Sequence, residues 1–194
     1  MTRSLHLVLT AAFAFLLAAS SARATDGLRY VEMQKTDVNG VPPLNGARGV
    51  ALSPDGRHLY AVAKTDDAIV VFSRDNATGH LTLVESQTHA TASDGLDGAS
   101  AVTVSPDGLH VYVASYVDDS VVAFSRNADT GALTWLERKH NGEGKVTGLN
   151  GAEAIALSPD GKFIYVAATN SDAVAVFARD AVTGTMKFAT TIVQ

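Results

Sequence analysis

Three copies of one stretch follow one another along the chain at intervals of about 50 residues. Each copy contains a Gly-Ala pair, a short apolar run, the turn Ser-Pro-Asp-Gly and a second apolar run with a tyrosine in it. The copies span residues 45–63, 98–114 and 151–167. A fixed period of this length indicates a supersecondary unit that packs against its neighbours, so the repeat determines the fold class.

Each repeat predicts four short strands. In the first copy the expected strands are residues 49–53, 58–63, 68–73 and 81–86, which are rich in Val, Ile, Tyr, Phe and Thr and lack a helical period. The Ser-Pro-Asp-Gly turn joins the first two strands, because Pro presets a negative φ and Gly accepts a positive one. Six residues that end on Gly connect the third and fourth strands, so each repeat is an antiparallel meander.

The character of the strands predicts a β-propeller. The first strand is small and apolar, the second and third are apolar on both faces, and the fourth alternates. This order fits radial blades that are packed on both sides, from an innermost to an outermost strand. The predicted fold is therefore all-β: three four-stranded blades at about residues 46–88, 98–140 and 151–193, plus an orphan outer strand at 28–34.

Three blades cannot close a ring that needs at least four. The open faces would expose far more apolar surface than a monomer usually does. Two explanations stay open: the sequence is a piece of a longer propeller, or chains self-associate to cover the open blade faces.

The N-terminus reads as a secretory signal peptide over residues 1–24. Arg3 precedes an apolar run, and Ala22-Arg23-Ala24 is a small-residue cleavage pattern. The run is too short to span a bilayer, so we expect cleavage after Ala24, a propeller domain over residues 25–194, and a periplasmic or secreted protein without a membrane span.

Composition narrows the range of partners. The formal net charge is −5, no run of Lys or Arg occurs, and the chain has no cysteine. Nucleic acid is thus excluded as an expected partner, as is thiolate or redox chemistry. The expected partner is a small molecule or a protein at the mouth of the propeller channel, and the sequence implies no cofactor.

Residues that recur in all three copies are interpreted as structural, since one active site does not need them three times. The Asp column is expected to bond nearby backbone N–H groups in turns. The Arg column is expected to lie at blade edges with its charged heads in solvent. The Tyr column is expected in the core or between blades. These columns are Asp67, Asp119 and Asp172; Arg74, Arg126 and Arg179; and Tyr60, Tyr112 and Tyr165.

Columns in which the copies disagree point to a ligand-binding face. The loop before the first strand and the loop after the second strand lie at the same end of an antiparallel blade. Polar residues vary at both places, and an Arg and a Glu that converge there could bind a polar ligand or polarise a lactone carbonyl. The ligand-binding candidates are Arg48, Ser100, Glu153, Lys64, Tyr116 and Asn170; ordinary variation of solvated loops is the alternative interpretation.

The histidines do not predict a metal site. No pair has His-x-His or His-Glu-x-x-His spacing, and no Gly-x-Ser-x-Gly element is present. His58 and His110 belong to the Ser-Pro-Asp-Gly side, away from the expected ligand face. Residues 94–98 lack the later Glu of a calcium loop and are interpreted as a Gly-rich turn.

The Ser-Pro-Asp-Gly turns and the Val-Tyr-Val-Ala strands resemble exported bacterial propellers, namely the seven-bladed lactonase family (6-phosphogluconolactonase-like) and the YVTN-repeat proteins, over residues 26–194. The resemblance implies a lactonase-like fold. Enzymes of that family carry an Arg-His or Pro-His element before an innermost strand, whereas this chain has Arg48-Gly49, Ser100-Ala101 and Glu153-Ala154 there. The catalytic residues therefore do not carry over, and the catalytic set is unknown.

Two functions follow as hypotheses. The first is an exported binding or scaffold module. The second is a sugar-lactone hydrolase whose active site needs blades absent from this chain, with Arg48 and Glu153 contributing.

Overall fold

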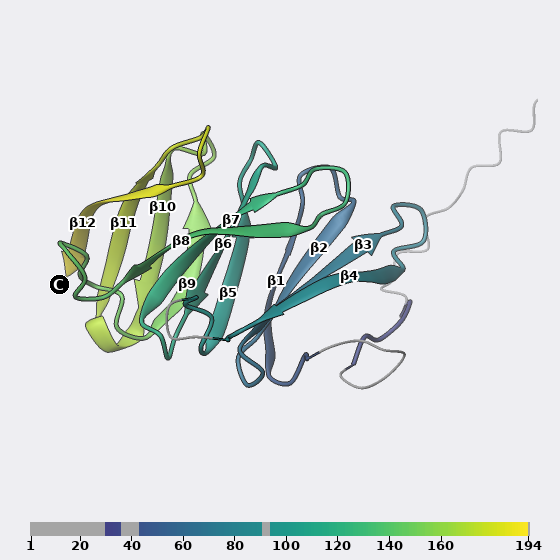
Figure 1. Cartoon of the computed structure of the whole chain (residues 1–194), viewed down its shortest axis with the longest axis horizontal. Helices are drawn as coiled ribbons and strands as arrows, with labels where there is room; N and C mark the ends of the chain where they lie inside the picture. Colours follow the sequence, from purple (N-terminus) through teal and green to yellow (C-terminus); the bar gives the residue numbers. More distant parts are fainter. Residues whose placement is uncertain (1–29, 36–42, 91–93, 194) are drawn as a thin grey trace, which may run out of the picture. The chain divides into compact units, whose positions relative to one another are not determined.

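The computed structural model describes residues 30–35, 43–90 and 94–193, which form three separate four-stranded antiparallel sheets (Figure 1). We call these sheets blades 1, 2 and 3. Blade 1 contains β1 (Ala47–Leu52), β2 (His58–Ala63), β3 (Ala68–Arg74) and β4 (Leu81–Thr88). Blade 2 contains β5 (Ala99–Val104), β6 (His110–Ser115), β7 (Ser120–Arg126) and β8 (Leu133–His140). Blade 3 contains β9 (Ala152–Leu157), β10 (Phe163–Ala168), β11 (Ala173–Arg179) and β12 (Met186–Val193), with a 3-10 turn, η1 (Thr169–Ser171), after β10.

The meander order predicted from the repeat is confirmed in every blade. Strands pair in chain order within each sheet, and the first two strands are joined by the Ser-Pro-Asp-Gly turn. In blade 1 the Gly56 N–H donates to Ser53 O at 2.8 Å, and the Ser53 N–H donates to His58 O at 2.9 Å. β1 begins two residues earlier than expected, because Ala47 still pairs with Ala63 across a bulge.

Hydrophobic cores lie between neighbouring blades. One core combines Tyr60 and Val62 of β2 with Val111 and Val113 of β6, and a second core joins blades 2 and 3. The expected burial of the middle strands on both faces is confirmed for β6, in which every residue is buried. It is wrong for β10, which alternates between exposed and buried residues. No other blade among the described residues covers the second face of β10.

The described part of the N-terminal segment, which was predicted to form an orphan outer strand, does not form a strand. Residues 28 and 29 lie outside the described residues, and residues 30–35 form no strand. Glu32 nevertheless makes the contact that an outer strand makes elsewhere: its Oε1 accepts a hydrogen bond from Leu81 N at 2.5 Å. Glu85 accepts from Leu133 N at 2.8 Å in the same way between blades 1 and 2. The segment thus holds the position of an outer strand without strand pairing.

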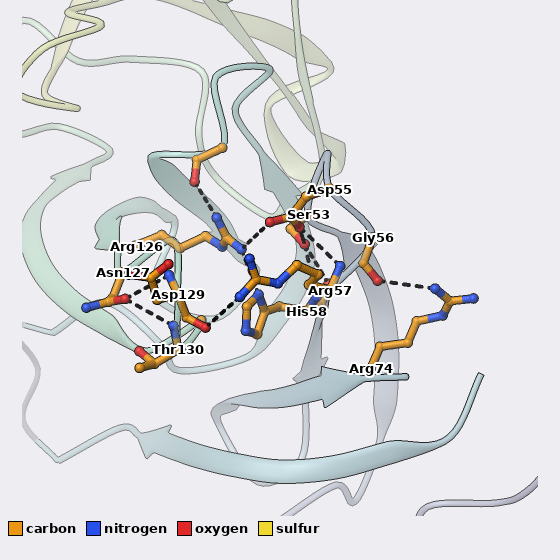
Figure 2. Close-up of polar contacts among 12 residues, drawn as sticks. Ser53, Asp55, Gly56, Arg57, His58, Arg74, Arg126, Asn127, Asp129 and Thr130 are labelled. Carbon is orange, nitrogen blue, oxygen red and sulfur yellow. Dashed lines mark hydrogen bonds and ion pairs between the residues drawn. The ribbon is translucent and has the colours of Figure 1, made fainter. Parts of the chain in front are cut away.

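An arginine at the end of the third strand joins blade 2 to blade 1, and another joins blade 3 to blade 2. Arg126 of blade 2 is only 6% exposed and lies beside Asp55 and His58 (Figure 2). It donates from Nε to Tyr60 Oη at 2.6 Å, and its Nη2 lies 2.7 Å from His58 Nδ1. Because a guanidinium can only donate, His58 must accept through an unprotonated Nδ1. Tyr60 completes the joint by donating to Gly131 O at 2.9 Å.

The joint between blades 2 and 3 has the same design. Arg179 donates from Nε to Tyr112 Oη at 2.9 Å, lies 2.7 Å from His110 Nδ1, and donates to Asp107 Oδ2 at 2.7 Å. Burial raises the pKa of Tyr112 to about 12, so its hydroxyl stays protonated and donates to Gly184 O at 2.8 Å. We refer to this Arg-Tyr-His arrangement as the inter-blade joint.

The inter-blade joint corrects two sequence-based interpretations. Arg126 and Arg179 do not extend their heads into solvent, because the preceding blade buries both guanidinium groups. Arg74 has no such blade before it among the described residues. It donates to Gly56 O at 3.2 Å (Figure 2) and to Asn76 Oδ1 at 2.7 Å. The prediction that Tyr60 and Tyr112 lie between blades is confirmed.

The Asp column forms a second link between blades. Asp67 and Asp119 have left-handed φ values of 51° and 46°, as expected for turn residues. Their carboxylates do bond backbone N–H groups, but the partners lie in the next blade: Asp67 accepts from Gly98 N at 2.8 Å, and Asp119 accepts from Gly151 N at 2.7 Å. The Asp column therefore sets the spacing of adjacent blades at the end opposite the Ser-Pro-Asp-Gly turns.

A matched pair of substitutions tests the energetic weight of the inter-blade joint. We expect Arg126→Met to lower the free energy of unfolding by about 3–5 kcal/mol, because it removes a buried charge from its hydrogen-bond partners. Arg74→Met, at the same position of blade 1, should cost about 1 kcal/mol or less, since its contacts are partly exposed. Urea unfolding of both variants measures the difference. Equal losses would contradict the assigned role of the joint.

The joint histidines predict a loss of stability in mild acid. Burial, and secondly the neighbouring arginine, lowers the pKa of His58 and of His110 below the ordinary value. Above the pKa of about 6.5 that a histidine has in the unfolded chain, these two histidines cost no stability. As the pH falls below that value, the unfolded chain binds protons more readily than the folded protein does, so stability is lost. The free energy of unfolding should therefore decrease between pH 7 and pH 5 in urea titrations. His58→Asn with His110→Asn should flatten this slope; an unchanged slope in the double variant would refute the assignment.

Candidate functional site

All six sequence-predicted ligand residues lie at one end of the blades, opposite the Ser-Pro-Asp-Gly turns, and all but Ser100 are at least partly accessible there. Arg48 of β1 forms an ion pair with Glu153 of β9, although 105 positions separate them in the sequence. The pair spans blades 1 and 3, and β5 of blade 2 lies between, in contact with both β1 and β9. Both side chains stay accessible, at 46% and 31% exposure. The predicted convergence of an Arg and a Glu is thus found in the structure.

A second row of contacts follows the loops after the second strands. The Lys64 ammonium lies 3.7 Å from the centre of the Tyr116 ring, a cation–π contact between blades 1 and 2. The Tyr116 hydroxyl donates to Asn170 Oδ1 at 3.4 Å and so reaches blade 3. Each blade therefore places one polar loop residue in the same row.

The turn that precedes each first strand holds these loops in place. The N–H groups of Lys64 and Tyr116 donate to Gly46 O at 3.0 Å and to Gly98 O at 2.9 Å. Gly98 has a φ of +71°, and a Cβ at this position would lie 2.7 Å from Val117 N. Only glycine fits here, so the repeated Gly-Ala pair sets the position of the variable residues that follow the second strand.

Ser100 is not available to a ligand, contrary to the prediction. Its side chain is buried, and its hydroxyl donates to Ala114 O at 3.0 Å and to Ala152 O at 2.8 Å. The hydroxyl links blade 2 to blade 3 beneath the ion pair. In the aligned repeats Ser100 takes the position of Arg48 and Glu153, so its polar side chain also suggested a ligand contact. The packed structure shows that its hydroxyl is already bonded to β6 of its own blade and to β9 of blade 3.

A cluster of ionisable side chains that no sequence pattern predicted joins the inter-blade loop after β4 to Asp118 of the loop after β6. His89 Nδ1 lies 2.7 Å from Asp94 Oδ1 and 3.7 Å from Asp118 Oδ2, and ligand-capable atoms of the three residues lie within 4.8 Å of one another. Burial raises the pKa of nearby Asp97, and Asp67 and Asp118 add to the effect. His89 and Asp94 share one loop, but Asp118 comes from another, so local spacing could not reveal the whole cluster; it brings an imidazole nitrogen close to two carboxylates.

The side chains at this end of the blades include groups that acid–base chemistry on a carbonyl compound would use. The Arg48 guanidinium offers several N–H donors to a developing oxyanion. The Glu153 carboxylate beside it can accept a proton from water when ionised. Lys64, Tyr116 and Asn170 add hydrogen-bonding groups for a polar ligand along the same end of the blades.

Three sheets of four antiparallel strands, joined in chain order through their faces, define the chain as part of a β-propeller. A family described as "Lactonase, 7-bladed beta-propeller" matches residues 31–194. The chain belongs to this lactonase family of seven-bladed propellers, which confirms the resemblance drawn from the repeats.

Named relatives are similar to this chain over part of their length. A "Probable 6-phosphogluconolactonase" of Arthroderma benhamiae is 30% identical over 75% of this chain and 38% of its own length. A "6-phosphogluconolactonase" of Formosa agariphila is 27% identical over 84% of this chain and 44% of its own length. The structure of the periplasmic gluconolactonase of Pseudomonas aeruginosa superposes with a TM-score of 0.66, at 31% identity, over 78% of this chain and 41% of that one. The chain thus spans less than half the length of these relatives.

No helix within the described residues has the length and apolar character that a membrane crossing requires.

Proposed function

We propose that the protein containing these blades hydrolyses a sugar lactone, with Arg48 and Glu153 at the mouth of the propeller channel. The Arg48–Glu153 pair carries the proposal, because it places an electrophilic and a basic group together on the first strands of a lactonase-family propeller. The names of the relatives support the substrate class, since they include 6-phosphogluconolactonases and a gluconolactonase. The rest of the active site would lie on blades outside this chain.

The proposed reaction is a direct hydrolysis of the ring ester. Glu153 takes a proton from a water molecule, and the resulting hydroxide adds to the lactone carbonyl carbon. The carbonyl oxygen becomes an oxyanion, which Arg48 stabilises through its N–H groups. Collapse of this intermediate breaks the bond between the carbonyl carbon and the ring oxygen. The proton held by Glu153 passes to that oxygen, and the product is the open hydroxy acid.

We prefer the hydrolase hypothesis to the hypothesis of a binding or scaffold module. A pure binding module does not require an accessible Arg–Glu pair shared between blades 1 and 3. Exposed ion pairs contribute only about 0–1 kcal/mol to the free energy of folding. A purely structural role would therefore stabilise the protein very little. Retained lactone binding without turnover would restore the binding module as the better description.

Lactone hydrolysis by the full-length gene product tests the proposal. With glucono-δ-lactone as substrate, we expect Arg48→Ala to lower kcat/KM by about 100-fold or more, as the loss of one oxyanion donor does. Glu153→Gln should reduce kcat by a similar factor. Lys187→Ala removes an exposed charge on β12, far along the chain from the pair, and should leave turnover unchanged. Turnover that is indifferent to both site variants, in proteins with unchanged melting temperature, would reject the mechanism.

We also propose that the protein is exported through residues 1–24, which lie outside the described residues. The periplasmic relative of Pseudomonas aeruginosa supports this location. N-terminal sequencing of the exported protein should begin at Thr25. A Leu16→Arg substitution, which interrupts the apolar run, should retain the protein in the cytoplasm. Export that is insensitive to this substitution would show that another signal operates.

A further inference from the structure

Three side chains that can bind a metal ion meet where the connection between blades 1 and 2 passes the loop after β6. His89 Nδ1 lies 2.7 Å from Asp94 Oδ1 and 3.7 Å from Asp118 Oδ2, and ligand atoms of all three residues lie within 4.8 Å of one another. The three side chains are partly buried, at 25%, 21% and 14% exposure. One imidazole nitrogen and two carboxylates form a mixed donor set, and first-row divalent metal ions bind such sets in proteins.

The Nδ1 atom of His89 is buried and forms no hydrogen bond within residues 30–35, 43–90 and 94–193, although Asp94 Oδ1 lies only 2.7 Å away. A protonated His89 would direct its Nδ1–H at a carboxylate and form a charge-assisted hydrogen bond. A buried nitrogen without such a bond costs free energy. An unprotonated Nδ1 that coordinates a metal ion has its lone pair satisfied, so an ion between His89 and the carboxylates would remove this cost.

Backbone N–H groups hold both carboxylates in place. Ala90 N donates to Asp94 Oδ2 at 2.6 Å, and Leu96 N donates to Asp94 Oδ1 at 3.3 Å. Asp97 N donates to Asp118 Oδ2 at 2.9 Å. Outer hydrogen bonds of this kind orient metal ligands, and each carboxylate keeps lone pairs for an ion because it has about four acceptor positions. Two ionised carboxylates also outweigh the single charge that an imidazole can carry, so the cluster attracts a cation.

The junction between blades 2 and 3 forms in the same way without these ionisable side chains. Its equivalent positions carry neutral residues, namely Asn141, Thr147 and Ser171. Ser171 Oγ accepts a hydrogen bond from Asn150 N at 3.1 Å, as Asp118 Oδ2 does from Asp97 N. The backbone link therefore needs a polar oxygen at this position and not a charge. The fold alone does not account for a histidine and two aspartates in the first junction.

We propose that His89, Asp94 and Asp118 bind one divalent transition-metal ion, with Zn²⁺ as the expected ion. Two ligand atoms that each lie about 2.1 Å from one ion are about 3.0–3.4 Å apart at octahedral or tetrahedral angles. The two distances from His89 Nδ1, 2.7 Å and 3.7 Å, lie on either side of this range. The imidazole favours Zn²⁺ over Ca²⁺, since Ca²⁺ takes oxygen ligands. Water would complete the coordination, because the side chains are partly exposed.

The ion would connect the inter-blade loop after β4 to the loop after β6. Asp118 follows Tyr116 of the candidate site by two positions in this second loop. Metal binding would therefore stabilise the protein and fix this loop at the end of the blades where the candidate site lies. The proposal does not depend on lactone hydrolysis, because it concerns binding alone.

Calorimetric titration with Zn²⁺ tests the proposal on protein that is prepared without a polyhistidine tag and freed of metal with EDTA. We expect saturable binding of one Zn²⁺ per protein. His89→Asn and Asp118→Ser introduce the residues of the second junction, so both variants should fold, and each should weaken binding at least about tenfold. Asp66→Ser is the matched control: Asp66 accepts Asn45 N at 2.7 Å at the equivalent position of blade 1, and its loss should leave the affinity unchanged.

Thermal unfolding gives a second measurement. Excess Zn²⁺ should raise the melting temperature of the parent protein and of Asp66→Ser, but not that of Asp118→Ser. Absence of saturable Zn²⁺ binding would overturn the proposal, as would binding that both site variants leave unchanged. Binding that is lost in His80→Asn instead would place the ion at the exposed His80–Glu32 pair and reject the assigned ligands. Binding of Ca²⁺ without Zn²⁺ would reject the transition metal.

Discussion

The buried guanidinium at each inter-blade joint is the interaction on which the rest of this structure depends. A blade is a small sheet with two apolar faces, and apolar contact alone would allow it to slide or tilt on its neighbour. Arg126 removes that freedom, since its donors must meet Tyr60 Oη, Gly108 O and His58 Nδ1 at once. Burying a charge is costly unless every donor is used, so the joint favours a single arrangement of the blades.

The candidate site is a consequence of this arrangement. Arg48 and Glu153 come from first strands that are separated by β5, so their contact depends on the angle set by two successive joints. The Asp67 and Asp119 links act at the same end as the site and set the distance between its loops. Lys64 and Tyr116 occupy equivalent loop positions, and Asn170, one position further along the loop of blade 3, extends the same row. A repeated backbone with variable side chains in its loops allows one end of a propeller to bind a ligand.

The contrast between blades 2 and 3 shows what a neighbouring blade contributes. Every residue of β6 is buried, whereas Phe163 and Tyr165 on the equivalent strand β10 remain exposed. The amino-acid pattern of the two strands is nearly the same, so the difference comes from the surroundings and not from the sequence of the strand. Exposure of the aromatic residues of β10 therefore reflects the absence of a neighbouring blade on that face among the described residues.

The blade is specified locally: the period, the Ser-Pro-Asp-Gly turns and the apolar strands define a four-stranded meander through local propensity, and these features repeat in the sequence. The sequence also indicated that Arg48 and Glu153 converge, because antiparallel strands bring their loops to one end. The burial of Arg126 and the hydrogen bonds of the Ser100 hydroxyl became visible only in the packed structure. Packing alone brought Asp118 of the loop after β6 to His89 and Asp94 of the loop after β4. The physical reason is that these contacts form only when separate sheets pack face to face. Their partners lie far apart in the sequence, so residue spacing within one repeat does not predict them.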